Sequence, residues 1–76
     1  MLSKKEEQKI LNAIGKNIRT LRTERGLSQF QLHVDAEISK NQIGRLERGE
    51  RNVKITTLYK IAKALQVDIS EILSSK

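Results

Sequence analysis

Residues 28–49 constrain the fold of this chain more than any other stretch of its 76 residues. Ser28 and Ser39 each stand where a helix N-cap is expected, and each precedes a short run with apolar residues at helical spacing. Gly49 closes the second run, and glycine is the usual residue just beyond a helix C-terminus because it tolerates left-handed backbone angles. The stretch therefore predicts two short helices, 28–36 and 39–48, with only a few residues between them.

The rest of the chain also has helical periodicity and no strand pattern. Ser3 and Glu6 have the spacing of a capping box, apolar residues then recur every three or four positions, and Gly26 ends the run. We therefore expect a long helix over about 4–25 and two more over about 55–65 and 69–74, giving an all-α fold of five helices in one domain, residues 1–76. The expected core residues are Leu11, Ile14, Ile18, Leu21, Leu27, Leu32, Ile43, Leu46, Val53, Leu58, Ile61, Ala62, Leu65, Ile69 and Ile72.

Charge and composition narrow the class of partner. Fifteen Lys and Arg against nine Asp and Glu give a net charge of +6 and a pI near 10.0. Such a balance favours a polyanion, nucleic acid before anionic membrane, while a charge that serves only solubility is the alternative. The absence of cysteine excludes disulfides and thiolate metal sites, and no apolar run is long enough to span a membrane or to act as a signal peptide. A cytoplasmic protein is therefore expected.

The second short helix begins with Lys40, Asn41 and Gln42, and Arg45 follows one turn later. Lysine and arginine suit the acceptors of guanine, and asparagine and glutamine suit adenine, although a solvated helix start is the alternative. Two helices joined by a tight turn, the second carrying such side chains, are typical of a helix-turn-helix DNA reader, so we predict that these four residues contact bases. The basic and amide residues that follow the helix are predicted to contact phosphates: Arg48, Arg51, Asn52 and Lys54.

Several motifs combine into a family resemblance: Ile14-Gly15, Arg22-x-x-x-Gly26-Leu27-Ser28-Gln29-x-x-Leu32, Ile38-Ser39-x-x-x-Ile43-x-x-Leu46-Glu47-Arg48-Gly49 and Thr57-Leu58-x-Lys60-Ile61-Ala62-x-Ala64-Leu65. Together they resemble the lambda-repressor-like family, also called the Cro or Xre type, over about 14–73. The run 47–52 is also similar to small controller proteins of restriction–modification systems. The resemblance implies a compact five-helix DNA-binding domain. It further implies that Gln29 lies near the phosphates and the first base, and that Arg22 pairs with Glu47 and also touches phosphate.

Two positions depart from the family pattern. His33 replaces a small residue where the two short helices approach each other, so its imidazole must tilt outward or widen the contact. Glu37 replaces the glycine of the turn, where a positive φ costs a residue with a Cβ about 1 kcal/mol. Either the turn differs here or the chain accepts the strain. A lone histidine without cysteine partners is not a metal site, so we expect neither metal nor cofactor.

The sequence therefore predicts a sequence-specific double-stranded-DNA-binding transcriptional regulator. One short recognition helix reads few base pairs, so we expect a homodimer on a palindromic operator. The predicted dimer interface is the last helix, through Ile69, Ile72 and Leu73, with the long first helix as a second possibility. The alternative is that these three side chains lie wholly in the monomer core. No nucleophile-and-base set or phosphate-cradling glycine loop is present, so an enzyme is not expected.

Two alternatives to a general or restriction–modification regulator stay open at this point. The first is an antitoxin-type protein that binds a toxin protein and autoregulates its own operon, since one fold serves both roles. The second is a protein-interaction adaptor that does not bind DNA.

Overall fold

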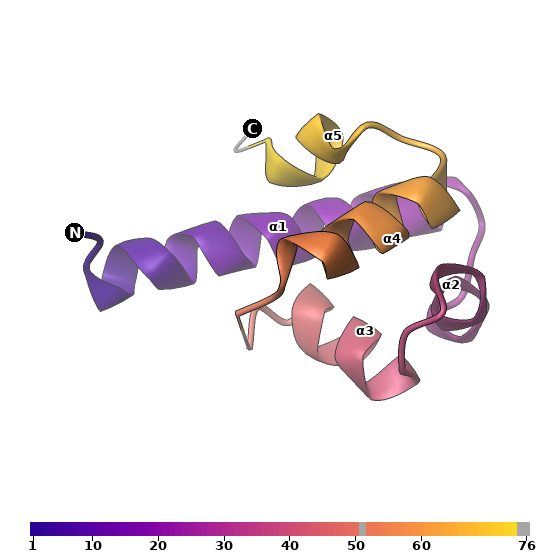
Figure 1. Cartoon of the computed structure of the whole chain (residues 1–76), viewed down its shortest axis with the longest axis horizontal. Helices are drawn as coiled ribbons and strands as arrows, with labels where there is room; N and C mark the ends of the chain where they lie inside the picture. Colours follow the sequence, from indigo (N-terminus) through magenta and orange to yellow (C-terminus); the bar gives the residue numbers. More distant parts are fainter. Residues whose placement is uncertain (51, 75–76) are drawn as a thin grey trace.

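The computed structural model describes residues 1–50 and 52–74, which contain five helices and no strand (Figure 1). The helices are α1 (Lys4–Glu24), α2 (Gln29–Ala36), α3 (Lys40–Glu47), α4 (Ile55–Leu65) and α5 (Ile69–Leu73). The predicted all-α, five-helix fold is confirmed, and every helix begins and ends within one residue of its predicted bounds. Helix α1 runs the length of the molecule; α3, α4 and α5 pack against it, and α2 packs against α3 and α4 (Figure 1).

Serine caps begin the first three helices. Ser3 accepts a hydrogen bond from the backbone N–H of Glu6, and the Glu6 carboxylate accepts one from the backbone N–H of Ser3. This capping box lowers the pKa of Glu6, chiefly because the backbone N–H stabilises the charged carboxylate. Ser28 and Ser39 likewise accept the backbone N–H three residues further on. Three local signals therefore set where α1, α2 and α3 begin.

Helices α1 to α4 all end in a Schellman motif, in which one residue adopts left-handed angles. That residue is Gly26 after α1 and Gly49 after α3, but Glu37 after α2 and Gln66 after α4, with φ values of 58° and 59° for the last two. The turn between α2 and α3 thus keeps left-handed geometry without glycine. The sequence left two possibilities at Glu37, a different turn or a strained one. The structure has the usual turn, and Glu37 accepts the strain of a positive φ.

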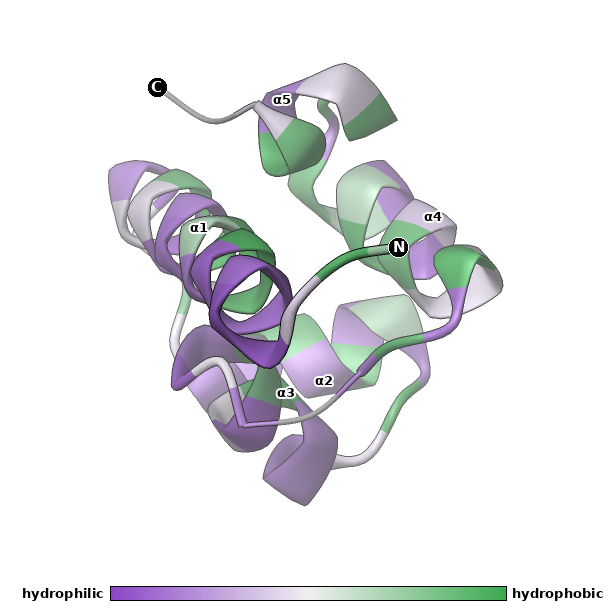
Figure 2. Cartoon of the chain, turned by 90° about the vertical axis from the view of Figure 1, so that its left-hand side faces the viewer, coloured by the Kyte–Doolittle hydropathy of each residue, from purple (hydrophilic) through white to green (hydrophobic). Residues whose placement is uncertain are grey.

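The core forms where the apolar faces of the helices meet. In Figure 2 the outward side of α1 is hydrophilic, and hydrophobic residues lie on the sides of α1, α4 and α5 that face one another. Most of the predicted core residues are buried; Leu11 is half-buried, and Ala36 is buried although it was not predicted. Predicted core residues that pack at the edge, only partly buried, are Leu21, Leu27, Val53 and Ile69.

Helix α5 requires one correction. Ile72, predicted to help form a dimer interface, has no exposed surface and lies wholly within the core. The reason is that α5 folds back on α1, where Asn17 Nδ2 donates hydrogen bonds to the carbonyl oxygens of Ile72 and Ser74. Ile69 is partly buried, and Leu73 remains 46% exposed. Of the three predicted interface residues, Leu73 is therefore the one with substantial surface for a partner.

Helix α3 is positioned by a close approach to α1. A Cβ on Gly15 of α1 would lie 2.3 Å from the carbonyl oxygen of Leu46 and 2.8 Å from that of Glu47. Glycine at this position lets the backbones of α1 and α3 touch directly. The last turn of α3 is thereby set against the middle of the longest helix.

Candidate nucleic-acid interface

The first turn of α3 presents polar side chains to solvent. Lys40, Asn41 and Arg45 are exposed, and Gln42 is half-buried. Two surface hollows flank these side chains, and both are lined in part by Asn41 and Arg45. The first hollow is completed by Gln29, Lys40, Gly44 and Arg48, and the second by Ser39, Gln42, Leu46 and Asn52.

Within the described part of the chain, the side chains of Lys40, Asn41 and Arg45 make no hydrogen bond or ion pair. Their donors, and the amide oxygen of Asn41, are therefore available to an external partner. Lysine and arginine carry positive charge here, and the asparagine amide both donates and accepts. This combination matches the acceptors and donors on base edges and the charge of phosphates.

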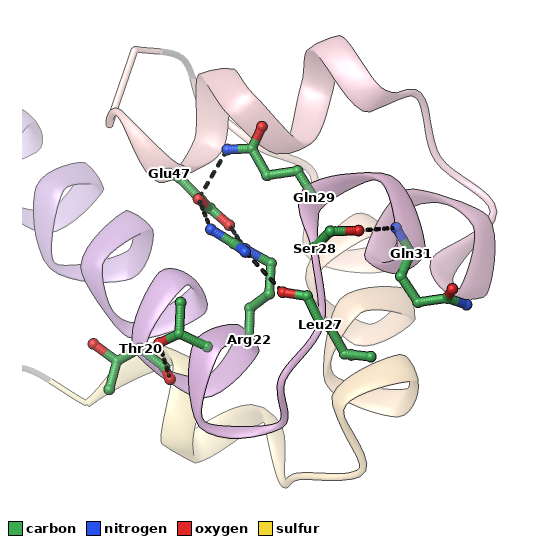
Figure 3. Close-up of polar contacts among 8 residues, drawn as sticks. Thr20, Arg22, Leu27, Ser28, Gln29, Gln31 and Glu47 are labelled. Carbon is green, nitrogen blue, oxygen red and sulfur yellow. Dashed lines mark hydrogen bonds and ion pairs between the residues drawn. The ribbon is translucent and has the colours of Figure 1, made fainter.

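The last turn of α3 is held by a buried ion pair. Arg22 Nε lies 2.6 Å from Glu47 Oε2, and Arg22 Nη2 lies 3.0 Å from Oε1. The side chains of Arg22 and Glu47 are only 11% and 4% exposed, and Arg22 Nη1 also donates to the carbonyl of Leu27 (Figure 3). The hydrogen bonds from its guanidinium to Glu47 raise the pKa of Arg22. The pair joins α1 to α3 as the family resemblance implied, and burial leaves little of Arg22 for a phosphate.

Gln29 makes a contact that the sequence did not predict. Its Nε2 donates to Glu47 Oε1 at 3.0 Å, so one carboxylate receives hydrogen bonds from α1 and α2 (Figure 3). An ionised carboxylate only accepts hydrogen bonds, so the NH₂ group of Gln29 must face Glu47 and its amide oxygen must point away. Gln29 still lines the hollow that contains Lys40 and Arg45, with one end already fixed.

The predicted phosphate contacts lie in the segment that follows α3. Arg48 is exposed and forms an ion pair with Glu50, and this hydrogen bond raises the pKa of Arg48. A Cβ on Gly44 would lie 3.2 Å from Arg48 Nη1, so the guanidinium of Arg48 extends over that glycine. Asn52 and Lys54 are exposed on the same segment. Arg51, the remaining predicted phosphate contact, lies outside the described residues.

His33 supports the turn between α2 and α3. Its Nδ1 lies 3.0 Å from the carbonyl oxygen of Ile38, and because a carbonyl only accepts, Nδ1 carries the proton. The ring of Phe30 packs against the imidazole edge to face, with the ring centroids 4.9 Å apart. The half-buried imidazole thus contacts the turn that contains the strained residue Glu37.

Neither a membrane-spanning helix nor a metal-binding group of side chains is found in residues 1–50 and 52–74. None of the helices there combines the length and the apolar character needed to cross a lipid bilayer. The same residues contain no group of three or more histidine or acidic side chains placed to hold a metal ion.

Three known proteins are similar to this chain over most of their own length. The HTH-type transcriptional regulator y4dJ of Sinorhizobium fredii is 38% identical over 61 residues, which are 80% of this chain and 79% of that protein. The control protein C.SmaI of Serratia marcescens is 37% identical over 65 residues, which are 86% of this chain and 77% of that protein. Among solved structures, the restriction-modification controller protein C.AhdI of Aeromonas hydrophila superimposes with a TM-score of 0.80 at 37% identity. That match covers 82% of this chain and 94% of C.AhdI.

The family match covers the whole helix-turn-helix unit and most of the core around it. Residues 18–72 match the helix-turn-helix family HTH_3, from the last two turns of α1 to the buried Ile72 of α5. The α2–turn–α3 unit, its left-handed turn and the Arg22–Glu47 pair all lie within that segment. The chain therefore belongs to the helix-turn-helix family of lambda-repressor-like, Xre- or Cro-type proteins, which are DNA-binding transcriptional regulators rather than enzymes.

Proposed function

We propose that this protein is a sequence-specific regulator that binds double-stranded DNA as a homodimer on a palindromic operator. The observation that carries the proposal is the difference between the two ends of α3. Its first turn presents polar side chains without internal partners to solvent, and its last turn is held by the Arg22–Glu47 ion pair. In this family of motifs the beginning of the second helix enters the major groove. Lys40, Asn41, Gln42 and Arg45 then read bases, and Gln29 contacts the edge of the site.

The residues after α3 would hold the DNA backbone. Arg48, Arg51, Asn52 and Lys54 follow the reading helix, so they would meet phosphates on the rim of the groove. Arg48 already has a carboxylate partner in Glu50, and it would exchange that partner for a phosphate oxygen. Arg22 we assign to the ion pair alone, because its side chain is almost enclosed.

Salt dependence tests the DNA-binding role. A dimer that neutralises roughly 6–10 phosphates should lose about 10³–10⁵-fold in affinity between 50 and 200 mM salt, because condensed counterions are released on binding. The operator would first be obtained by selection from a random DNA pool, and the titration would then be run on that sequence. Affinity that stays constant across the titration, or a pool that yields no enriched sequence, would exclude a sequence-specific DNA-binding role.

The homodimer is proposed to use the exposed side of α5. Leu73 remains 46% exposed beside the core, and a second copy could cover it in a two-fold interface that sets the reading helices about 34 Å apart. Sedimentation equilibrium of Leu73→Glu should show a folded monomer. Val34→Glu on α2 is the matched control, because Val34 is 49% exposed and the charge change is the same. If Leu73→Glu stays dimeric, the interface lies elsewhere, with α1 as the next candidate.

We propose more specifically that this regulator controls a restriction–modification system. C.SmaI is named as a control protein and C.AhdI as a restriction-modification controller, and each is 37% identical to this chain. Neighbouring genes for a DNA methyltransferase and a restriction endonuclease would support this role. A neighbouring toxin gene would instead favour the antitoxin role, and binding of the purified toxin would then be the direct test.

A further inference from the structure

The first turns of α1 lie against the turn that follows α3. Gln8 Nε2 donates to the carbonyl oxygen of Gly49 at 2.7 Å and lies 2.9 Å from Asn12 Oδ1. Figure 1 shows the segment between α3 and α4 beside the N-terminal half of α1. The contact joins residues 41 positions apart in the sequence and is partly buried. It therefore ties the beginning of the chain to the exit from the helix assigned to DNA reading.

The turn at Gly49 packs tightly against Asn12 of α1. Gly49 has φ +67°, and a Cβ on it would lie 2.3 Å from Asn12 Oδ1 and 3.2 Å from the Asn12 backbone. One turn further along α1, Gly15 meets the carbonyl oxygens at the end of α3 in the same way. Gly15, Asn12 and Gln8 thus form a continuous line of contact between α1 and the C-terminal end of α3. Asn12 packs against the turn at Gly49, and Gln8 is the member of this line whose side chain donates a hydrogen bond to it.

The turn connects α3 to the residues that would contact the DNA backbone. Arg48 precedes Gly49, and Asn52 and Lys54 follow it within five residues. Phosphate contacts depend on where the backbone places these side chains, because they fix register rather than read bases. The matched family segment covers residues 18–72, so Gln8 and Asn12 both precede it.

We propose that Gln8 is a positioning residue for DNA binding: it holds the turn at Gly49 so that the side chains of Arg48, Asn52 and Lys54 face the phosphates. The inference rests on the proposed DNA-binding function. Gln8 itself touches no DNA in this arrangement; it acts through the Gly49 carbonyl and through the amide of Asn12. The extended start of α1 is then part of the DNA-binding apparatus and not only a longer helix.

The test compares Gln8→Met with Gln31→Met in the full chain. Methionine keeps the length and helix propensity of glutamine but has no N–H donor. Gln31 is the matched control, because its Nε2 makes the equivalent bond to Asp35 Oδ1, four residues on in α2, and no hydrogen bond to another helix among the described residues. Affinity for the selected operator, and for a panel of its single-base variants, would be measured from 50 to 200 mM salt. Circular dichroism and chemical denaturation would accompany each variant.

We expect Gln8→Met to bind on the order of 10-fold more weakly on every sequence of the panel, with its base preference unchanged. The plot of log affinity against log salt should become less steep, with the magnitude of its slope reduced by about one per subunit, as when one phosphate contact is lost. Gln31→Met should match the wild type in both. A purely structural role would lower only the folded fraction and would leave the slope unaltered.

Each other outcome overturns the proposal in a distinguishable way. If Gln8→Met binds like Gln31→Met while the wild type shows strong salt dependence, the DNA-binding function stands and the role of Gln8 is wrong. If Gln8→Met changes base preference, Gln8 affects the reading face and not the backbone contacts. If the wild type and Gln31→Met bind no DNA, the proposed function and the role of Gln8 both fail.

Discussion

The two ends of α3 differ sharply in their surroundings. At its first turn, Lys40 and Asn41 make no contact through polar side-chain atoms with the described residues, and the Ser39 side chain caps the backbone. At its last turn, Glu47 is almost fully buried and receives hydrogen bonds from Arg22 and Gln29. Gly49 then fits against α1 so closely that no side chain could be added without displacing Asn12.

Within the eight residues of α3, the last turn therefore positions the helix and the first turn is left to recognise DNA. A helix fixed at its C-terminal end by α1 and α2 has a defined direction, so its N-terminal side chains need no internal partner to be well placed. Those side chains can then change without affecting the fold. The reverse holds for the last turn, where the polar groups are satisfied inside the protein and any change should affect stability first.

The largest expected effect follows from removing Glu47. Glu47→Ala leaves Arg22 and Gln29 desolvated without their shared acceptor, so the free energy of unfolding should fall by about 3–5 kcal/mol, as for other broken buried pairs. The double variant Arg22→Ala/Glu47→Ala should lose less than the sum of the two single variants. Chemical denaturation of the four proteins gives this coupling energy. Additive losses would mean that the last turn of α3 is not held by this pair.

The next largest effect concerns Gly49, and Gly26 serves as its control. Both residues have left-handed angles, with φ values of 67° and 69°, but a Cβ on Gly26 would meet nothing within 4 Å. Gly26→Ala should therefore cost only about 1 kcal/mol for the backbone angle, and Gly49→Ala about 2–4 kcal/mol because it also displaces Asn12. Thermal or chemical unfolding of both variants measures the difference. Equal losses would show that the turn after α3 is not packed tightly on α1.

Much of the fold could be predicted from the sequence because its signals are local. Serine caps, glycines at helix ends and apolar residues at helical spacing placed all five helices to within one residue. The end of α4 has no glycine to mark it, and apolar spacing alone indicated where the helix ends. The left-handed angles of Gln66 could not be predicted, because in a residue other than glycine they depend on tertiary packing. Ile72 was predicted both as a core residue and as part of the dimer interface, because periodicity marks an apolar side chain without saying whether α1 or a second copy covers it; the structure places it in the core.

The candidate site was predictable in its exposed part and less so in its supporting contacts. Lys40, Asn41 and Arg45 lie where a motif and helical geometry place them, and the Arg22–Glu47 pair followed from the family resemblance. The contact of Gln29 with Glu47 joins residues 18 positions apart, and that of Gln8 with Gly49 joins residues 41 apart. Nothing in the spacing of these residues links them, because their proximity arises only when α1 and α2 pack on α3.

The reading end of α3 should respond to substitution in specificity and not in stability. Asn41→Ala should leave the free energy of unfolding within about 0.5 kcal/mol of the wild type, because its side chain has no internal partner. Discrimination at one or two base pairs should fall by about 1–3 kcal/mol. Lys54→Ala is the contrasting variant: it should weaken binding to all sequences alike. A panel of single-base operator variants measures both, and a stability loss in Asn41→Ala comparable to that of Glu47→Ala would abolish the contrast between the two ends.

The smallest effect concerns the turn that leads into the first turn of α3. Glu37 has φ 58° and ψ 42°, angles that cost a residue with a Cβ about 1 kcal/mol, so Glu37→Gly should raise the free energy of unfolding by about 0.5–1 kcal/mol. Gln66→Gly, with φ 59° at the end of α4, should give a similar gain far from the reading helix. The two variants should differ in DNA binding, because a flexible glycine before α3 loosens the turn that the His33–Ile38 hydrogen bonds and the Ser39 cap help to hold. If the last turn alone orients α3, Glu37→Gly and Gln66→Gly will bind the operator equally well. A several-fold weaker affinity in Glu37→Gly alone would show that the strained turn also positions the reading end.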